Sequence, residues 1–208
     1  VVSWFADRAA RAPEQPPKVQ KLSAFENANG ETRVSWMGHS TMLVEMDERR
    51  ILIDPVFSDH ASPFGWLPPK SFYKEMPTTP GSLGRVDAVV ISHDHYDHLD
   101  HESILALRDR AERFIVPLGV GSHLRFWGIA AHRITELDWW QQTRLDSLTF
   151  TATPTHHFSG RGLTNGNSTL WAGWAIRGER HNIFYSGDTA YFPGFKEIGE
   201  RLGRFDLT

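Results

Sequence analysis

The sequence predicts a mixed α/β protein whose β-sheets are covered by helices. Short apolar runs separated by turn residues dominate residues 33–54, which is typical of strands. A continuous apolar run follows at 86–91 and suits a buried strand. From residue 100 onward, helical spacing alternates with further strand-like runs. Strands first, then strands mixed with helices, is the order found in α/β and α+β domains.

The first half of the chain contains an irregular arm and the opening strands. Residues 1–32 are polar and carry prolines, so we expect an N-terminal arm before a single domain over 33–208. Residues 55–80 hold six of the twelve prolines and several aromatic side chains, and two interpretations stay open for this loop: a lipid-facing lid or a cover packed over the strands. The predicted strands of this half lie at 33–37, 41–46, 50–54 and 86–91.

The second half mixes both element types. Asp100 is a candidate N-cap for a helix over 100–110, because apolar residues then recur at helical spacing. Residues 205–208 resemble the opening of another buried strand, so we expect the domain to be incomplete at its C-terminus. The remaining predicted elements are strands at 114–116, 133–137, 140–146, 147–153, 169–177 and 182–186, helices at 119–128 and 194–203, and a glycine-rich loop at 154–168.

Composition excludes several classes of function. The 208 residues include no cysteine, which rules out disulfides, thiolate metal ligands, iron–sulfur clusters and cysteine nucleophiles. The net charge is −3 with no basic stripe, which argues against a nucleic-acid partner. No apolar run approaches the ~20 residues that span a bilayer. The compartment stays open between cytoplasm and periplasm.

Histidine is the unusual residue, with 11 in the chain and four of them between positions 93 and 101. The run His93-Asp94-His95-Tyr96-Asp97-His98 follows the buried strand directly and precedes the helix. In an extended stretch, His93 and His95 point to the same side. Imidazoles together with a carboxylate form a ligand set for zinc or another divalent ion. The run therefore predicts a metal site.

Two further strand ends carry metal-ligand types. His156 and His157 follow the strand that ends near 153, and Asp188 follows the strand that ends near 186. Alone, each would be an ordinary surface or turn feature. Ends of neighbouring strands meet at one edge of a sheet, so we expect these residues to join the histidine run.

These motifs together resemble the metallo-β-lactamase fold superfamily, and within it the N-acyl-phosphatidylethanolamine phospholipase D-like branch. The resemblance implies an αββα sandwich of two mixed sheets with outer helices. Its motifs run from about Val34 to the end of the chain. They are Trp36–Thr41, Ile53–Ser58, Ala61–Pro63, Val89–Asp100, Leu170–Trp171, Ser186–Tyr191 and Phe205–Leu207.

The resemblance also implies roles for single residues. His93, His95 and His157 would bind one zinc ion, with His157 chosen over His156 because it precedes the aromatic Phe158. Asp97 and His98 would bind a second ion, Asp188 would bridge the two, and another divalent transition metal could replace zinc. Asp97 and Asp188 would be catalytic, holding a metal-bound hydroxide.

Two other residues are expected beside the ions. Asp54 would orient the histidine run through hydrogen bonds, although an ordinary strand-end aspartate before Pro55 is an equal alternative. His39 would lie near the site by resemblance, and a structural histidine on a turn is its alternative.

The implied function is a metal-dependent hydrolase, namely a phosphodiesterase of phospholipase D type acting on a small-molecule or lipid-like phosphodiester. A lactonase or other ester hydrolase, a nuclease of the same superfamily and a non-catalytic metal-binding fragment remain alternatives. Peripheral contact with a membrane stays open. The family supplies one more histidine to the second metal from a downstream strand, and this chain has no counterpart before Thr208. We therefore expect a companion polypeptide or a second copy to complete the fold.

Overall fold

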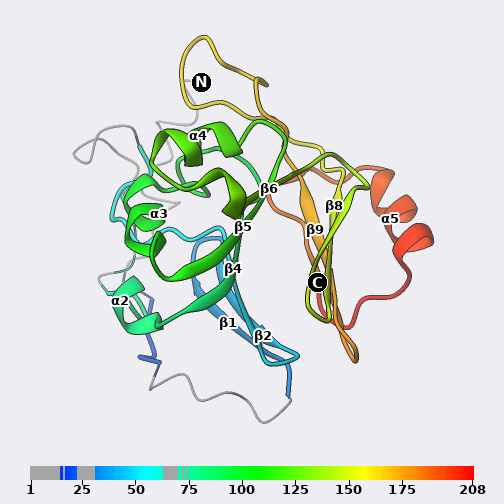
Figure 1. The fold of residues 1–208 in the computed structure, drawn as a ribbon, viewed down its shortest axis with the longest axis horizontal. Helices are drawn as coiled ribbons and strands as arrows, with labels where there is room; N and C mark the ends of the chain where they lie inside the picture. The colour runs from blue at the N-terminus through cyan, green and yellow to red at the C-terminus, as the bar shows by residue number, and fades with distance from the viewer. Residues whose placement is uncertain (1–14, 16, 23–30, 63–69, 72, 74) are drawn as a thin grey trace.

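A computed structural model describes residues 15, 17–22, 31–62, 70, 71, 73 and 75–208 (Figure 1). Most of the predicted N-terminal arm and the tip of the 55–80 loop lie outside the described residues, so neither interpretation of that loop is decided. Within the described part, no helix has the length and apolar character needed to cross a bilayer.

The first sheet has six strands in the order β1-β2-β3-β4-β5-β6. The pairs β1–β2 and β2–β3 are antiparallel, whereas the pairs from β3 to β6 are parallel. The carboxyl ends of the parallel strands therefore meet at one edge, the usual place for a ligand site in such sheets. The strands are β1 (Arg33–Gly38), β2 (Thr41–Met46), β3 (Arg49–Ile53), β4 (Val86–Val90), β5 (Ala111–Pro117) and β6 (Ile134–Leu137).

The second sheet has four antiparallel strands in the order β10-β9-β8-β7. They are β7 (Gln142–Leu145), β8 (Leu148–Thr153), β9 (Gly173–Arg177) and β10 (Asn182–Tyr185). At the outer edge, Leu207 forms an isolated parallel bridge with Ile183 of β10.

The helices are short and lie on the outer faces. Asp100 caps α3 as predicted, because its carboxylate accepts a hydrogen bond from the Ser103 amide. The α-helices are α2 (Pro80–Leu83), α3 (His101–Leu107), α4 (Gly121–Phe126) and α5 (Gly194–Leu202), and η2 (Ala131–Arg133) is a 3₁₀ turn.

The layers follow from alternation of apolar side chains along the strands. In β3, Ile51 and Ile53 face the second sheet, while Leu52 faces the helices on the other side. In β9, Trp174 lies between the sheets and Ala175 faces α5. Helices α2, α3 and α4 thus cover the first sheet and α5 covers the second (Figure 1). The predicted αββα sandwich with outer helices is confirmed. Two mixed sheets were expected, but only the first is mixed, because each strand of the second sheet pairs antiparallel with its neighbour in the sequence.

Several predicted boundaries were wrong: β5 begins at Ala111 and not at 114, and α3 ends at Leu107 and not at 110. The structure gives the reason for three others. The strand expected from 169 begins at Gly173, since the Leu170 and Ala172 amides bind the carbonyls of Leu118 and Ser92 instead. The helix expected from 119 begins at Gly121, because Gly119 has a positive φ of 87°.

The strand expected from 140 begins at Gln142. Residues 138–141 form a turn in which the Gln141 amide donates to the Asp138 carbonyl. Trp140 has a positive φ of 70° within that turn, which is incompatible with a strand. The helix α2 was not predicted and lies at the end of the 55–80 loop.

Candidate metal centre

All eight predicted site residues lie where strands of the two sheets end. Asp54 follows β3, and residues 92–98 follow β4. His157 and Asp188 come shortly after β8 and β10 of the second sheet, and His39 lies in the turn between β1 and β2. Two contacts hold the sheets together here: the Trp174 indole donates to the Ile91 carbonyl at 2.9 Å, and the Ala172 amide donates to the Ser92 carbonyl at 2.9 Å.

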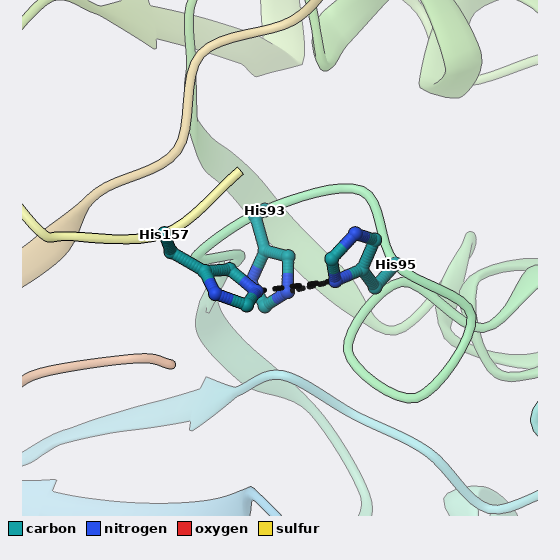
Figure 2. A group of neighbouring side chains, drawn as sticks. All are labelled: His93, His95 and His157. Carbon is teal, nitrogen blue, oxygen red and sulfur yellow. Dashed lines mark hydrogen bonds between the residues drawn. The ribbon is translucent and has the colours of Figure 1, made fainter. Parts of the chain in front are cut away.

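Three of the predicted ligands form one histidine cluster: His93, His95 and His157. Nε2 of His93 lies 2.8 Å from Nδ1 of His95, and Nε2 of His157 lies 3.2 Å from the same Nδ1. Figure 2 shows the three rings turned toward one another. The three facing nitrogens could hold one metal ion.

A second group of ligand atoms lies beside the first. Nε2 of His98 is 3.3 Å from Oδ1 of Asp188, and the other Asp188 oxygen is 3.7 Å from Nε2 of His157. Asp188 therefore lies between the two groups. The ligand atoms of Asp97, His98 and His39 lie within 4.8 Å of one another, and Asp97 accepts a hydrogen bond of 3.0 Å from Nε2 of His39.

The histidine cluster is held uncharged. Burial and the neighbouring imidazoles of His98, His95 and His157 lower the pKa of His93 to about 2. Burial is also the main cause that lowers the pKa values of His95 and His157. Neutral imidazole is the form that binds a metal, so the cluster is prepared for a cation without loss of protons from these rings.

His98 has the opposite electrostatic setting. Its burial opposes a positive charge, but the carboxylates of Asp188 and Asp54 on either side raise its pKa to about 10. Its Nε2 is buried and has no hydrogen-bond partner of ordinary geometry. A buried polar atom without a partner is uncommon and calls for a ligand. A cation between His98 and Asp188 would supply that partner.

The carboxylates are held ionised. Burial alone would raise the pKa of Asp97, but the hydrogen bond from His39 and the charge of His98 hold it well below its usual range. The close approach of His98, whose Nε2 lies 3.3 Å from Oδ1 of Asp188, is the main cause that lowers the pKa of Asp188 to about 2. Both side chains are therefore carboxylates at neutral pH, with negatively charged oxygens available to a cation.

Ligand spacing supports the same interpretation. A tetrahedral zinc ion with bonds of about 2.0–2.1 Å keeps its ligand atoms about 3.3 Å apart. The ligand atoms are 2.8 and 3.2 Å apart in the histidine cluster, where His95 faces His93 and His157. The oxygens of Asp188 lie 3.3 Å from His98 and 3.7 Å from His157. A set of imidazoles and ionised carboxylates at these distances fits a divalent cation.

Asp54 is fully buried and makes the hydrogen bond expected of it. Its Oδ2 accepts from Nδ1 of His98 at 2.7 Å, from the Ser92 hydroxyl at 2.5 Å and from the Tyr185 hydroxyl at 2.7 Å. Its Oδ1 accepts from the Ser92 amide at 2.7 Å. Four donors thus converge on one carboxylate, which links β3, the histidine run and the end of β10.

The two adjacent histidines after β8 have different surroundings. The His157 ring turns into the cluster, whereas His156 is exposed and its ring faces Phe192 at a centroid distance of 6.2 Å. The backbone explains this difference, because His156 pairs with Ala190 in an isolated bridge and its amide binds the Thr189 hydroxyl.

Sequence reasoning missed three residues that hold the site. Ser92 and Tyr185 bind Asp54, and Arg161 donates from Nη1 to the carbonyls of Asp94 and Leu99 at 2.8 and 2.7 Å. The Arg161 guanidinium also lies 4.0 Å from the Tyr96 ring centroid. Adjacency to His93 is the only sequence signal that could have indicated Ser92. Tyr185 and Arg161 come from distant segments and carry no such signal.

Several known proteins resemble this chain. An uncharacterized protein of Mycobacterium tuberculosis is 46% identical over 212 residues, which cover 100% of this chain and 56% of the relative. N-acyl-phosphatidylethanolamine-hydrolyzing phospholipase D 1 of Caenorhabditis elegans is 36% identical over 183 residues, which cover 83% of this chain and 51% of the relative. A metal-dependent hydrolase of Pyrobaculum aerophilum is 27% identical over 172 residues, which cover 81% of this chain and 66% of the relative. The chain spans about half the length of the first two relatives.

Solved structures share the fold at low sequence identity. CmlA, a diiron beta-hydroxylase from Streptomyces venezuelae, aligns with a TM-score of 0.63 at 23% identity, over 88% of this chain and 35% of that one. A family model described as the Beta-lactamase superfamily domain matches residues 49–208. This match covers all four layers of the sandwich and every candidate ligand except His39, so the chain belongs to the beta-lactamase superfamily of metal-dependent hydrolases.

Proposed function

We propose that this chain carries the metal centre of a zinc-dependent phosphodiesterase that hydrolyses a phosphodiester with a lipid-like part. The observation that carries the proposal is the pair of adjacent ligand groups with Asp188 between them, 3.3 Å from His98 and 3.7 Å from His157. Phosphatases and nucleases are among the enzymes that use two metal ions about 3.5–4 Å apart. The 36% identity to a phospholipase D that hydrolyses N-acyl-phosphatidylethanolamine supports the substrate class.

In this proposal each ligand group holds one ion. His93, His95 and His157 would hold the first, and Asp97 and His98 the second, with Asp188 between them. Bound zinc supplies Lewis acidity, which polarises a phosphoryl oxygen and makes water a stronger nucleophile at neutral pH. Asp97 and Asp188 are ionised and can accept hydrogen bonds, so they would orient the attacking water by accepting hydrogen bonds from it.

Exposed apolar side chains near the centre support a lipid-like substrate. Phe158 is 57% exposed while its ring lies 4.8 and 4.7 Å from the ring centroids of His95 and His157. Tyr191 is 92% exposed and lies three residues after Asp188. Large apolar groups exposed beside a site favour an apolar ligand or a membrane surface, so contact with a membrane belongs to this proposal.

The first test measures metal and activity together. The purified chain is freed of metal with a chelator and titrated with zinc, and separately with iron(II) because a protein of this fold is a diiron enzyme. Hydrolysis of bis(4-nitrophenyl) phosphate is then compared with hydrolysis of 4-nitrophenyl acetate and of single-stranded RNA. We expect metal-dependent cleavage of the phosphodiester, and its loss in His157→Ala but not in His156→Ala.

Other outcomes would overturn the proposal. Cleavage of the acetate alone would identify an ester hydrolase, and cleavage of RNA as the preferred substrate would identify a nuclease. Metal binding with no cleavage of any of the three substrates would show a non-catalytic metal protein.

A further inference from the structure

The buried serine before the histidine run makes more contacts with the site than any role assigned so far requires. Ser92 is 1% exposed and lies between the end of β4 and His93. Its hydroxyl oxygen is 2.5 Å from Oδ2 of Asp54, 2.9 Å from Nδ1 of His93 and 3.3 Å from Nδ1 of His98. One hydroxyl therefore meets a histidine from each of the two ligand groups.

The donors and acceptors around Asp54 allow one arrangement of the protons. An ionised carboxylate only accepts hydrogen bonds, and a serine hydroxyl has one hydrogen to donate. The 2.5 Å contact places that hydrogen between Ser92 and Asp54, because this is the shortest contact of the hydroxyl and the carboxylate is its strongest acceptor. The hydroxyl oxygen then has only lone pairs to offer to Nδ1 of His93.

That arrangement decides the tautomer of His93. An imidazole that can bind a metal ion is neutral and carries one hydrogen, on one of its two nitrogens. With Ser92 as acceptor, the hydrogen is on Nδ1, and Nε2 keeps the lone pair that faces His95 at 2.8 Å. We propose that Ser92 is a positioning residue that holds His93 in the Nδ1–H tautomer and so keeps Nε2 free for a metal ion.

This inference deepens the proposed function and rests on it for the identity of the ligand. It differs from a simple packing role, in which the hydroxyl would only fill a buried space beside Gly187, whose added Cβ would lie 2.9 Å from Cβ of Ser92. A packing role leaves the tautomer of His93 undecided. The orientation of a ligating histidine by the group on its other nitrogen is a known way of tuning a metal site.

The chain provides a matched control serine. Ser103 is 2% exposed, and its hydroxyl donates to Oδ2 of the buried Asp100, the N-cap residue of α3. It is thus a second buried serine–aspartate pair, with no imidazole on the serine. Ser103→Ala removes the same chemical group from a similar environment, and its effect on the site measures packing and stability alone.

The experiment reads the tautomer directly. Nitrogen-15 and proton NMR correlations of the metal-free chain at pH 7 distinguish Nδ1–H from Nε2–H in each histidine ring. We expect Nδ1–H for His93 in the natural chain, a shift toward Nε2–H in Ser92→Ala, and no change in Ser103→Ala. A zinc titration of the same samples should show a loss of affinity of about 10–100-fold for Ser92→Ala only.

Two results would overturn the proposal: an Nε2–H tautomer of His93 in the natural chain, or an unchanged tautomer in a folded Ser92→Ala variant. If Ser92→Ala does not fold, the tautomer in the natural chain decides the question alone. The proposed function fails separately, because absence of phosphodiester cleavage contradicts that function and leaves the tautomer of His93 as measured.

Discussion

Nδ1 of His98 lies 2.7 Å from Oδ2 of Asp54, and both side chains are fully buried. Breaking a buried pair by removing one partner costs about 3–5 kcal/mol, because the remaining charge or donor stays without compensation. We expect Asp54→Ala to lower the free energy of unfolding of the metal-free chain by about this amount, as measured by urea titration. It should also weaken zinc binding about 10–100-fold.

The control for this change is Asp109→Ala, which removes an aspartate whose side chain is 85% exposed. Asp109→Ala should leave the free energy of unfolding and the zinc affinity unchanged. If Asp54→Ala binds zinc like the natural chain, then Asp54 is only a strand-end residue and the site does not depend on it.

The second prediction separates the two adjacent histidines after β8. Only His157 turns its ring into the histidine cluster, with Nε2 3.2 Å from His95. We expect His157→Ala to lose about one equivalent of bound metal per chain and His156→Ala to keep the natural content, as measured by elemental analysis of dialysed protein. Equal metal loss in the two variants would contradict the assignment.

The third prediction concerns pH and Asp94, which is fully buried. Burial alone would raise its pKa, but hydrogen bonds from His123 and the Gly160 amide hold the pKa below its ordinary value. A carboxyl with a lowered pKa stabilises the folded state fully above its unfolded pKa of about 3.9, and this contribution disappears as the pH falls through the folded value.

We therefore expect Asp94→Asn to have a lower free energy of unfolding than the natural chain above about pH 4. This difference in free energy should become smaller as the pH falls further. Urea unfolding of both metal-free proteins over this pH range gives the comparison. A difference that stays constant with pH would show that the Asp94 charge contributes nothing.

The fourth prediction compares two glycines. Gly187 precedes Asp188 with a φ of 59°, and an added Cβ would lie 2.9 Å from Cβ of Ser92. Gly187→Ala should cost about 1–3 kcal/mol through backbone strain alone, and the displaced Asp188 should lower metal content. Gly199 lies in α5 with nothing within 4 Å of an added Cβ, so Gly199→Ala should stabilise the chain by about 0.5–1 kcal/mol. Thermal unfolding should show a lower melting temperature for Gly187→Ala and a higher one for Gly199→Ala than for the natural chain.

Local sequence was enough to predict most elements and the membership of the site. The strand predicted from the short apolar run in 41–46 matches β2 at both ends, and Asp100 caps α3, because short strands and helix caps are specified by neighbouring residues. His93, His95 and His98 lie within six residues, and the strand that precedes them holds them at one sheet edge. Candidate ligands at the ends of apolar strands could therefore be named before any coordinates.

Tertiary structure decided which of those residues meet and what holds them. Tyr185 donates to Asp54 across 131 positions, and His39 binds Asp97 across 58. No periodicity encodes such pairs, because the packing of the two sheets against each other brings these strand ends together. The same packing turns His157 inward and His156 outward. The sequence by itself determined the metal-ligand chemistry, and the folded sheets decided the partner of each ligand, because a hydrogen bond between distant segments exists only after their strands pack.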